Sequence, residues 1–307
     1  MSNKINVCLS TDNNYSKYAG VVIASVLSNS VDGDFNFYIL DGGISEENKA
    51  KILSLKSIKN CNIIFVPINE DLFSIYKQIG THSYISLSTY YRLKLASLLS
   101  DVDKVLYLDC DVIVNSDISD LFNTCIEQYY AAGVMDTAMT SSGWVPPLEK
   151  GNLYFNAGVL LFNLKKIRQD NIEQKFEEYT QKEFEHIRVG DQQIINVVCQ
   201  GNIKQVESAW NVQSSNFINR SDYTSSPKIV HYVGRQKPWI FGSMNYWKNL
   251  YFDILKITPW KISEQDSFRW TKLNQIVSIF NYIKYRPLFM FRPRFYKALF
   301  YTYLRKI

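Results

Sequence analysis

Short apolar runs alternate with longer segments of helical periodicity over the first 110 residues of the chain. The runs that predict strands are residues 4–9, 35–40, 62–66 and 104–108, and the segments that predict helices are residues 18–27, 45–55 and 89–99. Strands that alternate with helices favour a parallel sheet covered by helices. The order therefore predicts half of a nucleotide-binding α/β sheet.

Beyond this half, residues 131–135, 158–162 and 228–232 predict strands, and residues from about 165–180 and 192–199 predict helices. The first strand is followed by Ser10-Thr11-Asp12-Asn13-Asn14-Tyr15, where a dinucleotide-binding turn would have G-x-G-x-x-G, and the sequence contains no P-loop. Readings as an NAD-binding or ATP-hydrolysing protein therefore lack their main support.

Two carboxylates spaced by one residue, in Asp109-Cys110-Asp111, follow the predicted strand 104–108. Such a pair can share one hard divalent cation, and ligands of open α/β sheets bind at the carboxyl ends of the strands. The chain has three Asp-x-Asp triplets, the others being at 32–34 and 101–103, and Asp also serves turns for structural reasons. Only the position after a strand favours the triplet at 109–111 as a metal site.

His231 follows the apolar run 228–230 and precedes a loop with Gly234 and Lys237. A lone histidine at a strand end is often structural, but an imidazole would complete a mixed oxygen and nitrogen site suited to manganese. Gly234 allows close approach of the backbone to a phosphate, and Lys237 supplies a positive charge. Together these residues predict a diphosphate bridged by a metal ion and a lysine.

Seven motifs in order make the chain resemble glycosyltransferase family 8, the retaining enzymes with a GT-A fold that include bacterial lipopolysaccharide galactosyl- and glucosyltransferases. They are STDNNY at 10–15, LDGGISEENK at 40–49, TYYRLKL at 89–95, KVLYLDCDVIV at 104–114, YFNAGVLLFNL at 154–164, GDQQIIN at 190–196 and HYVGRQKPW at 231–239. The resemblance implies a GT-A mixed α/β sheet flanked by helices, and a hexosyltransferase that uses a UDP-sugar and Mn²⁺ or Mg²⁺.

The resemblance also implies roles for individual residues. Those expected to hold uridine are Thr11, Asp12, Asn14 and Tyr15. The expected metal ligands are Asp109, Asp111 and His231, with Gly234 and Lys237 on the diphosphate. Those expected around the donor sugar are Arg92, Asn156, Asp191 and Gln192. Structural readings stand beside these, because Asn156 also suits a turn, Asp191 a helix cap and Tyr15 a packed aromatic.

The resemblance further implies an acceptor-facing carboxylate at Asp136, and the loop 137–152 is expected to cover the site. Tyr84 stands where some relatives carry histidine. For catalysis we favour transfer on one face of the sugar, with the departing phosphate taking the acceptor proton, because the Gln192 amide is a poor nucleophile. Asp191 is the nucleophile in the covalent alternative.

Charge divides the 307-residue chain into two parts. Residues 267–307 hold nine Lys/Arg and no Asp or Glu, so the net charge of +5 leaves −4 for the remainder. The tail also interleaves Tyr, Phe and Trp with these cations, which suits an interfacial segment on anionic lipid. We therefore expect a GT-A catalytic domain at 1–245 and a membrane-surface extension at 246–307. Nucleic-acid binding and a tail packed on its own body are the alternatives for this composition.

The five cysteines are widely spaced without a CxxC pair, which favours a reducing compartment over a disulfide framework. Because the N-terminus runs directly into a predicted strand, we expect no secretory signal, and we expect a cytoplasmic enzyme on the inner face of the cytoplasmic membrane. The expected partners are a UDP-hexose and a saccharide or glycolipid acceptor, without nucleic acid. A nucleotidyltransferase and a non-catalytic UDP-sugar-binding scaffold are the alternative functions.

Overall fold

The computed structural model describes residues 4–77, 79, 87–141, 148–214, 226–234, 237–240, 243 and 245–261, and isolated positions of the C-terminal segment at 277, 280, 283, 284, 291 and 296. Tyr84, the residues at 142–147 of the expected covering loop and most of the basic tail lie outside these ranges.

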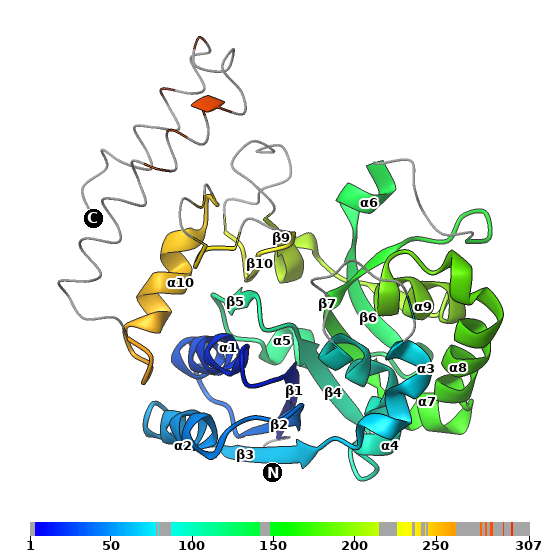
Figure 1. Ribbon diagram of the computed structural model, residues 1–307, viewed down its shortest axis with the longest axis horizontal. Coiled ribbons are helices and arrows are strands. Elements are labelled where there is room, and N and C mark those ends of the chain that lie inside the picture. Colours follow the sequence, from blue (N-terminus) through cyan, green and yellow to red (C-terminus); the bar gives the residue numbers. More distant parts are fainter. Residues whose placement is uncertain are drawn as a thin grey trace.

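The central sheet of the described chain has seven strands, which run in the order β3-β2-β1-β4-β7-β6-β8 (Figure 1). Their bounds are β1 Ile5–Thr11, β2 Phe35–Asp41, β3 Asn62–Pro67, β4 Lys104–Leu108, β6 Ala131–Met135, β7 Phe155–Asn163 and β8 Ile203–Gln205. Strands β1 to β4 are parallel, whereas β7 is antiparallel to both of its neighbours, β4 and β6. The sheet is therefore mixed, as expected.

A smaller three-stranded sheet continues the chain after β4. It pairs β5 (Val112–Val114) with β10 (Ile229–His231) in antiparallel register and β10 with β9 (Val212–Gln213) in parallel register. His231 lies opposite Val112, and the backbone N–H of Tyr232 donates to the carbonyl of Asp111 over 2.8 Å. This sheet therefore brings His231, which is distant along the chain, beside the end of β4.

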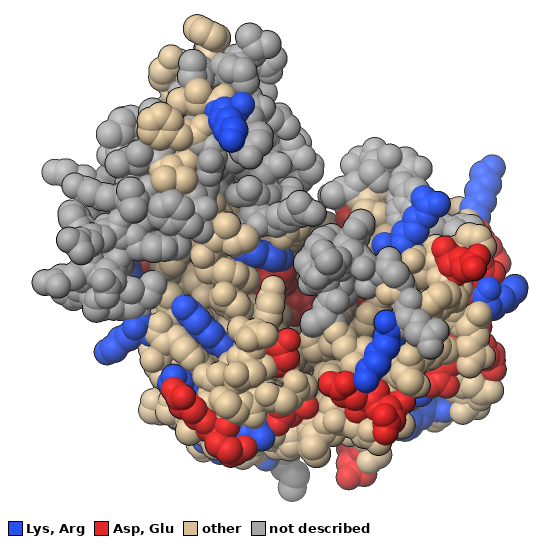
Figure 2. Space-filling view, viewed as in Figure 1, with Lys and Arg blue, Asp and Glu red and all other residues tan. Residues whose placement is uncertain are grey.

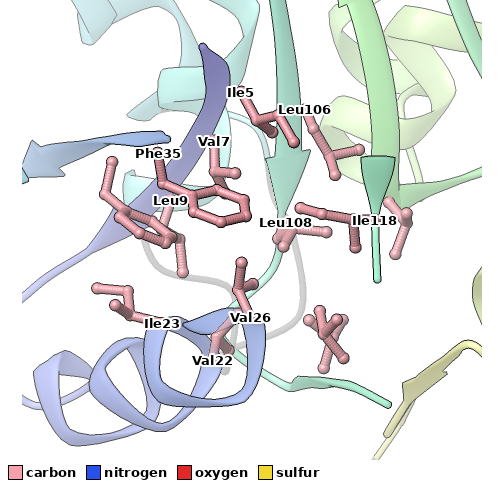
Figure 3. Close-up of a cluster of buried hydrophobic side chains, with 14 of the residues drawn as sticks. Ile5, Val7, Leu9, Val22, Ile23, Val26, Phe35, Leu106, Leu108 and Ile118 are labelled. Carbon is pink, nitrogen blue, oxygen red and sulfur yellow. The ribbon is translucent and has the colours of Figure 1, made fainter. Parts of the chain in front are cut away.

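Helices cover both faces of the central sheet (Figure 1). On one face, α1 (Ser16–Asn29), α2 (Glu46–Ser54) and α5 (Ser119–Phe122) lie over a core to which β1, β2 and β4 contribute. Figure 3 shows this core, where Val22, Ile23 and Val26 of α1 point toward Leu9 and Leu108 of the sheet. On the other face lie α3 (Ser74–Lys77), α4 (Leu95–Leu98), α7 (Leu164–Gln169), α8 (Ile172–Glu183) and α9 (Gly190–Val198). Removing these side chains from water stabilises the sheet by roughly 1.5–3 kcal/mol for each large aliphatic residue.

Two predicted helices differ from those observed. The segment 89–99 forms a 3₁₀ helix, η3 (Leu87–Lys94), followed by the short α4, and the four consecutive residues 90–93 are all buried. A segment enclosed on all sides gains little from the period of an amphipathic α-helix. The segment 165–180 is divided into α7 and α8 at Asn171, whose φ of 51° lies in the left-handed region that Asn tolerates better than most residues.

The segment after residue 245 packs against α1. Helix α10 (Lys248–Leu255) buries Tyr251 and Leu255 in a third cluster with Val21 of α1 and Ile113 of β5. A Cβ atom at Gly20 of α1 would overlap the Trp260 ring, so this pair needs a glycine. The chain is thus fixed to the body as far as Trp260.

Among the described residues, no helix combines the length and apolarity needed to cross a bilayer.

Candidate active site

The candidate site lies at the carboxyl ends of β1 and β4, the edge where open α/β sheets bind ligands. Strand β1 ends at Thr11, and β4 ends directly before Asp109. A cavity of about 340 Å³ lies at this edge. The predicted residues that line it are Tyr15, Arg92, Asp109, Asp111, Asn156, Asp191, Gln192, His231, Gly234 and Lys237.

Four predicted residues lie outside this lining. Thr11 is buried and its hydroxyl donates to the carbonyl of Asp12 over 3.1 Å. The Asp12 carboxylate accepts the backbone N–H of Tyr15 over 2.9 Å, and Asn14 is exposed. These contacts shape the loop that presents Tyr15. The fourth residue, Asp136, is described below with the amide side chains.

The Asp109-Cys110-Asp111 triplet directs its two carboxylates toward the cavity, whereas Cys110 is buried. The Cys110 thiol donates to the carbonyl of Ser10 over 3.2 Å, and burial raises the pKa of this thiol well above its ordinary value. A thiol that stays protonated is a poor metal ligand. The two aspartates are therefore the available ligands of the triplet.

His231 completes a cluster of three possible metal ligands. Ligand atoms of Asp109, Asp111 and His231 lie within 4.8 Å of one another. The His231 Nε2 atom lies 3.2 Å from Asp111 Oδ1 and 3.8 Å from Asp109 Oδ2. Asp111 Oδ1 is buried and receives no hydrogen bond from a described donor. Two carboxylates and one imidazole form a donor set that fits Mn²⁺ or Mg²⁺. The Asp111 Oδ1 atom, which receives no hydrogen bond from a described donor, also fits a role as a metal ligand.

Gly158 of β7 makes this convergence possible. A Cβ atom at residue 158 would overlap the His231 ring and would lie 2.7 Å from Asp109 Oδ2. Any larger residue would push the imidazole or the carboxylate away. The glycine lies within strand β7.

Lys237 lies on the other side of Asp111. Its ammonium group pairs with Asp111 Oδ2 and donates to the carbonyl of Tyr232 over 2.5 Å. Burial opposes ionisation of Asp111, but the charges of Lys237 and His231 together hold the pKa of this carboxyl below its ordinary value. Gly234, with φ of 70°, lies in the connecting loop and faces open space. The lysine therefore already contacts the carboxylate that would hold a cation.

Arg92 is buried and joins Asp109 to Asp191. Its Nη2 atom donates to Asp109 Oδ1 over 2.6 Å, and its Nε atom lies 3.0 Å from Asp191 Oδ2 while donating to the carbonyl of Thr89. Its Nη1 atom donates to the carbonyl of Ala157, and its guanidinium lies 4.3 Å from the centre of the Tyr107 ring. These contacts make Arg92 a clamp between two acidic residues.

Asp191 has an unusual protonation equilibrium. Burial raises the pKa of its carboxyl to about 6, an effect that Arg92 opposes and Asp109 reinforces. Asp191 lies in the first turn of α9 and is 5% exposed. A buried carboxyl with a perturbed pKa beside a possible metal site suggests a functional role.

Asn156, Gln192 and Asp136 form a hydrogen-bonded group beside the acidic residues. The Gln192 oxygen accepts the backbone N–H of Ala157 over 3.0 Å and the Asn156 amide over 3.3 Å. The Gln192 and Asn156 amide nitrogens both donate to Asp136 Oδ2, over 3.1 and 3.2 Å. Asp136 also accepts the N–H of Met139, at the start of the short helix α6 (Thr137–Ser141). It is buried behind Gln192.

The sequence analysis missed Asn211. This residue is 2% exposed, ends the 3₁₀ helix η5 (Ser208–Asn211) and contacts both Asn156 and His231. The only local signal for it is an asparagine directly before the apolar Val212 of β9, which is too weak to identify a site residue.

Aromatic side chains connect the site to helix α10. Tyr15, which is 41% exposed at the cavity, contacts Tyr18 edge-on with 5.2 Å between ring centres. Tyr18 stacks on Trp239 at 4.0 Å, and Trp239 contacts Tyr251 of α10 at 5.1 Å. Aromatic pairs at these separations add about 0.5–1.5 kcal/mol beyond burial. They hold the loop that carries Lys237 against α1.

Comparisons with known proteins agree with this geometry. The sequence model of the family described as Glycosyl transferase family 8 matches residues 6–241. The chain is 34% identical over 246 residues to a candidate glycosyltransferase of Haemophilus influenzae, covering 78% of this chain and 74% of that one. It is 28% identical over 274 residues to the lipopolysaccharide 1,2-glucosyltransferase of Escherichia coli K12, covering 84% and 79% of the two chains.

Among solved structures, the fold is similar to that of the galactosyltransferase LgtC in complex with donor and acceptor sugar analogues. The TM-score is 0.73 at 27% identity, over 86% of this chain and 99% of that one. The GT-A type of mixed α/β fold predicted from the sequence is thereby confirmed.

Proposed function

Because this chain belongs to glycosyl transferase family 8, we propose that it is a metal-dependent, retaining hexosyltransferase that moves galactose or glucose from a UDP-sugar to a saccharide acceptor. The predicted family and the predicted enzyme class, a glycosyltransferase, are confirmed by the family match. That match removes the nucleotidyltransferase alternative. The metal, the UDP-sugar, the stereochemical outcome and the acceptor are the proposed parts.

One observation carries the proposal. Asp109, Asp111 and His231 converge within 4.8 Å in the cavity that Lys237 and Gly234 also line. A nucleotide-sugar presents a diphosphate, and this group needs positive charge and close approach of a backbone. The site offers both beside a set of cation ligands.

The residues of the chain divide the work on the leaving group. Asp109, Asp111 and His231 would hold a Mn²⁺ or Mg²⁺ ion, which when bound supplies Lewis-acid stabilisation to the diphosphate. Lys237 supplies a second positive charge where negative charge grows as the glycosidic bond breaks. Gly234 keeps the adjoining loop free of a side chain that would block the phosphate.

The proposed uridine contacts lie at the end of β1. Tyr15 presents a half-exposed aromatic ring at the cavity, and Asp12 fixes its backbone. The predicted contacts of Thr11, Asp12 and Asn14 with the nucleoside stay predictions, since Thr11 is buried and Asn14 points to solvent in this structure.

On the sugar side, the arrangement favours same-face transfer. The Gln192 oxygen already accepts two hydrogen bonds, from Ala157 N–H and from Asn156, and such an oxygen is a weaker nucleophile still. Asp191 is held by Arg92 and stays the candidate for a covalent intermediate. Under the favoured reading, the departing phosphate takes the acceptor proton.

The names of relatives support the proposed substrates. They include a lipopolysaccharide 1,2-glucosyltransferase of Escherichia coli and a lipopolysaccharide 1,3-galactosyltransferase of Salmonella typhimurium, the latter 24% identical over 97% of this chain. We therefore propose lipopolysaccharide, lipooligosaccharide or another surface glycan as the acceptor. Asp136 is proposed to act on the acceptor side, through the amides that it orders.

We also propose that the segment after Trp260 holds the enzyme on the cytoplasmic face of the membrane. Nine Lys/Arg without Asp or Glu at 267–307 would attract anionic lipid, at about 1 kcal/mol for each cation near the surface. Figure 2 shows acidic and basic side chains intermingled over the visible face of the described body, so this face offers no comparable basic field.

The test of the transfer chemistry is release and binding of UDP. Manganese-dependent release of UDP from UDP-galactose or UDP-glucose is expected, with loss in EDTA and recovery on adding Mn²⁺. The same assay separates an enzyme from a non-catalytic UDP-sugar-binding scaffold, which would bind UDP without turnover. A chain that neither binds UDP nor releases it from any UDP-sugar, with or without saccharide acceptors, would overturn the proposal.

The test of the membrane segment is truncation after Lys261. The shortened chain keeps α10 and Trp260 on α1, so donor hydrolysis is expected to stay within about twofold of the full chain while binding to anionic vesicles is lost. Neutral phosphatidylcholine vesicles are the control. Undiminished binding of the truncated chain to anionic vesicles would contradict this part.

A further inference from the structure

We propose that Asn211 is a positioning residue that sets the hydrogen-bond polarity of the metal-binding histidine and ties it to the sugar side of the site. The inference rests on the proposed function, because it concerns how His231 is prepared for a cation. Neither the motifs of the sequence nor the chemistry assigned above uses Asn211.

The polarity of a backbone amide is unambiguous, because its N–H can only donate. The N–H of Gly158 donates over 3.0 Å to the side-chain oxygen of Asn156. The opposite end of that amide must then be the NH₂ group, and it faces two acceptors, the oxygens of Asp136 and Gln192. The orientation of the Asn156 side chain is therefore fixed by its surroundings.

Asn211 extends this polarity to the histidine. Its NH₂ group lies 2.9 Å from the Asn156 oxygen, which can only accept, so the Asn211 oxygen must face the other way. That oxygen lies 3.2 Å from His231 Nδ1. Because an amide oxygen only accepts, Nδ1 carries the hydrogen.

The hydrogen on Nδ1 determines the state of the other ring nitrogen, Nε2. With the hydrogen on Nδ1, the neutral His231 ring keeps a lone pair on Nε2, the atom that lies 3.2 Å from Asp111 Oδ1 and 3.8 Å from Asp109 Oδ2. That lone pair is directed into the proposed cation site. A hydrogen-bond acceptor behind a metal-binding imidazole fixes its tautomer and orientation and raises its basicity.

The burial of Asn211 makes this contact costly to lose. Asn211 is 2% exposed and His231 is 4% exposed, so water cannot replace the missing partner without a rearrangement. Gly158 also packs against the ring, since a Cβ there would overlap the imidazole. Asn211 and Gly158 together leave the His231 ring one orientation.

The first test measures Mn²⁺ affinity in the presence of saturating UDP, by titration calorimetry, for the full-length chain. Asn211→Leu removes the acceptor at similar size and is expected to weaken Mn²⁺ binding by roughly 10- to 100-fold. Asn211→Asp keeps an oxygen toward Nδ1 but faces the Asn156 oxygen with another acceptor. This variant is expected to retain Mn²⁺ affinity within about threefold and to lose about tenfold in kcat.

Asn163→Leu is the matched control. Asn163 caps α7 and donates to Ile126 near the far end of β7, so its loss removes hydrogen bonds without touching the site. Mn²⁺ affinity in this variant is expected to equal that of the wild type. A purely structural role for Asn211 would give the Leu variant the same unchanged affinity, and that result would overturn the inference.

The second test needs no variant of Asn211 and therefore does not depend on its folding. In the metal-free wild type labelled with ¹⁵N-histidine, the neutral ring of His231 is expected to show a protonated Nδ1 and an unprotonated Nε2. The chain has three histidines, and a His231→Ala variant assigns the signal. The opposite tautomer would overturn the inference alone, whereas a wild type without Mn²⁺ affinity in the presence of UDP would overturn the proposed function and this inference with it.

Discussion

The two halves of the candidate site are built on different principles. The charged half consists of Asp109, Asp111, His231 and Lys237. The amide half consists of Asn156, Gln192, Asp136 and Asn211. In the charged half, side chains compensate one another's charge. In the amide half, backbone N–H donors orient Asn156, Gln192 and Asp136, and the Asn156 oxygen in turn orients Asn211.

This difference between the halves shows which of them can exchange its internal contacts for contacts with a ligand. Lys237 and Asp111 form an ion pair that a diphosphate and a cation would each replace with a stronger partner, so the charged half is arranged for exchange. The amide half has its donors and acceptors matched among themselves, which makes it a preorganised wall. Substitutions in the first half should change binding and charge, and those in the second should change geometry.

The largest effect is expected from Asp111→Asn, which keeps the shape of the charged half and removes its shared charge. Metal-dependent turnover should fall by at least about 10³-fold, because both the cation and Lys237 lose their common partner. Measurement of UDP release at several Mn²⁺ concentrations, together with circular dichroism, checks activity and folding.

Asp103→Asn is the control for this change, since Asp103 belongs to another Asp-x-Asp triplet. Its exposed carboxylate pairs with Arg168 and lies outside the cavity lining. Activity within about twofold of the wild type is expected, as for most exposed ion pairs. An active Asp111→Asn enzyme would remove Asp111 from the metal site.

The next effect concerns the exchange of partners by Lys237. In Lys237→Met, UDP release should slow by about 10²-fold because charge on the leaving group loses a counter-charge. Affinity for Mn²⁺ without UDP should rise, because the ammonium no longer competes for Asp111 Oδ2. Calorimetry without nucleotide measures the second quantity.

The opposite directions of these two changes, slower release of UDP and higher affinity for Mn²⁺, distinguish a lysine that binds the leaving group from one that only packs the loop. A lysine that only packs the loop would lower both quantities or neither. Lys256→Met is the control, since Lys256 pairs with the exposed Asp253 on α10. It should change neither the rate of release nor the affinity for Mn²⁺.

The contrast between the halves also explains what the sequence could predict. Short contiguous motifs at the ends of predicted strands contain the charged half, so residue type and position sufficed to predict that Asp109, Asp111, His231 and Lys237 lie together. Their roles stay predictions. Asn211 lies in a short 3₁₀ segment without periodicity, and its partners are 20 and 55 residues away along the chain. Nothing local distinguishes such an asparagine from a capping or turn residue.

Prediction of the fold from the sequence is limited in the same way, by contacts between distant residues. Strands that alternate with helices were predictable because burial imposes their periods, as in β1, β2 and β4. The predicted strand 158–162 begins earlier, at Phe155. Asn156 can lie within the buried strand because it forms hydrogen bonds with distant residues, which cannot be predicted from the local sequence. Likewise, the segment 89–99 forms η3 because Arg92 and its neighbours are enclosed by groups that come from distant parts of the chain.

The smallest effect tests the boundary between the halves, at Asp191. The pKa of this carboxyl is raised from the ordinary 3.8 to about 6 by burial, with Arg92 opposing and Asp109 reinforcing the shift. A raised pKa means that the folded state favours the protonated form. Its contribution to stability is therefore fully present below about pH 4 and is lost as the pH rises through about 6.

Asp191→Asn removes this pH dependence. The unfolding free energy of the variant minus that of the wild type should increase by about 2 kcal/mol between pH 4.5 and pH 7, because the pKa of the carboxyl lies at about 6 in the folded state and 3.8 in the unfolded state. Urea denaturation in EDTA at pH 4.5, 5.5 and 7 measures it. Asp170→Asn should show almost no change over this pH range, because hydrogen bonds from Lys166 and Tyr130 lower the pKa of that carboxyl, so its contribution to stability is lost only as the pH falls below about 4. Equal slopes in both variants would mean that Asp191 is ionised as easily as a surface carboxylate, and the boundary between the halves would then be as charged as the cluster of Asp109, Asp111 and His231.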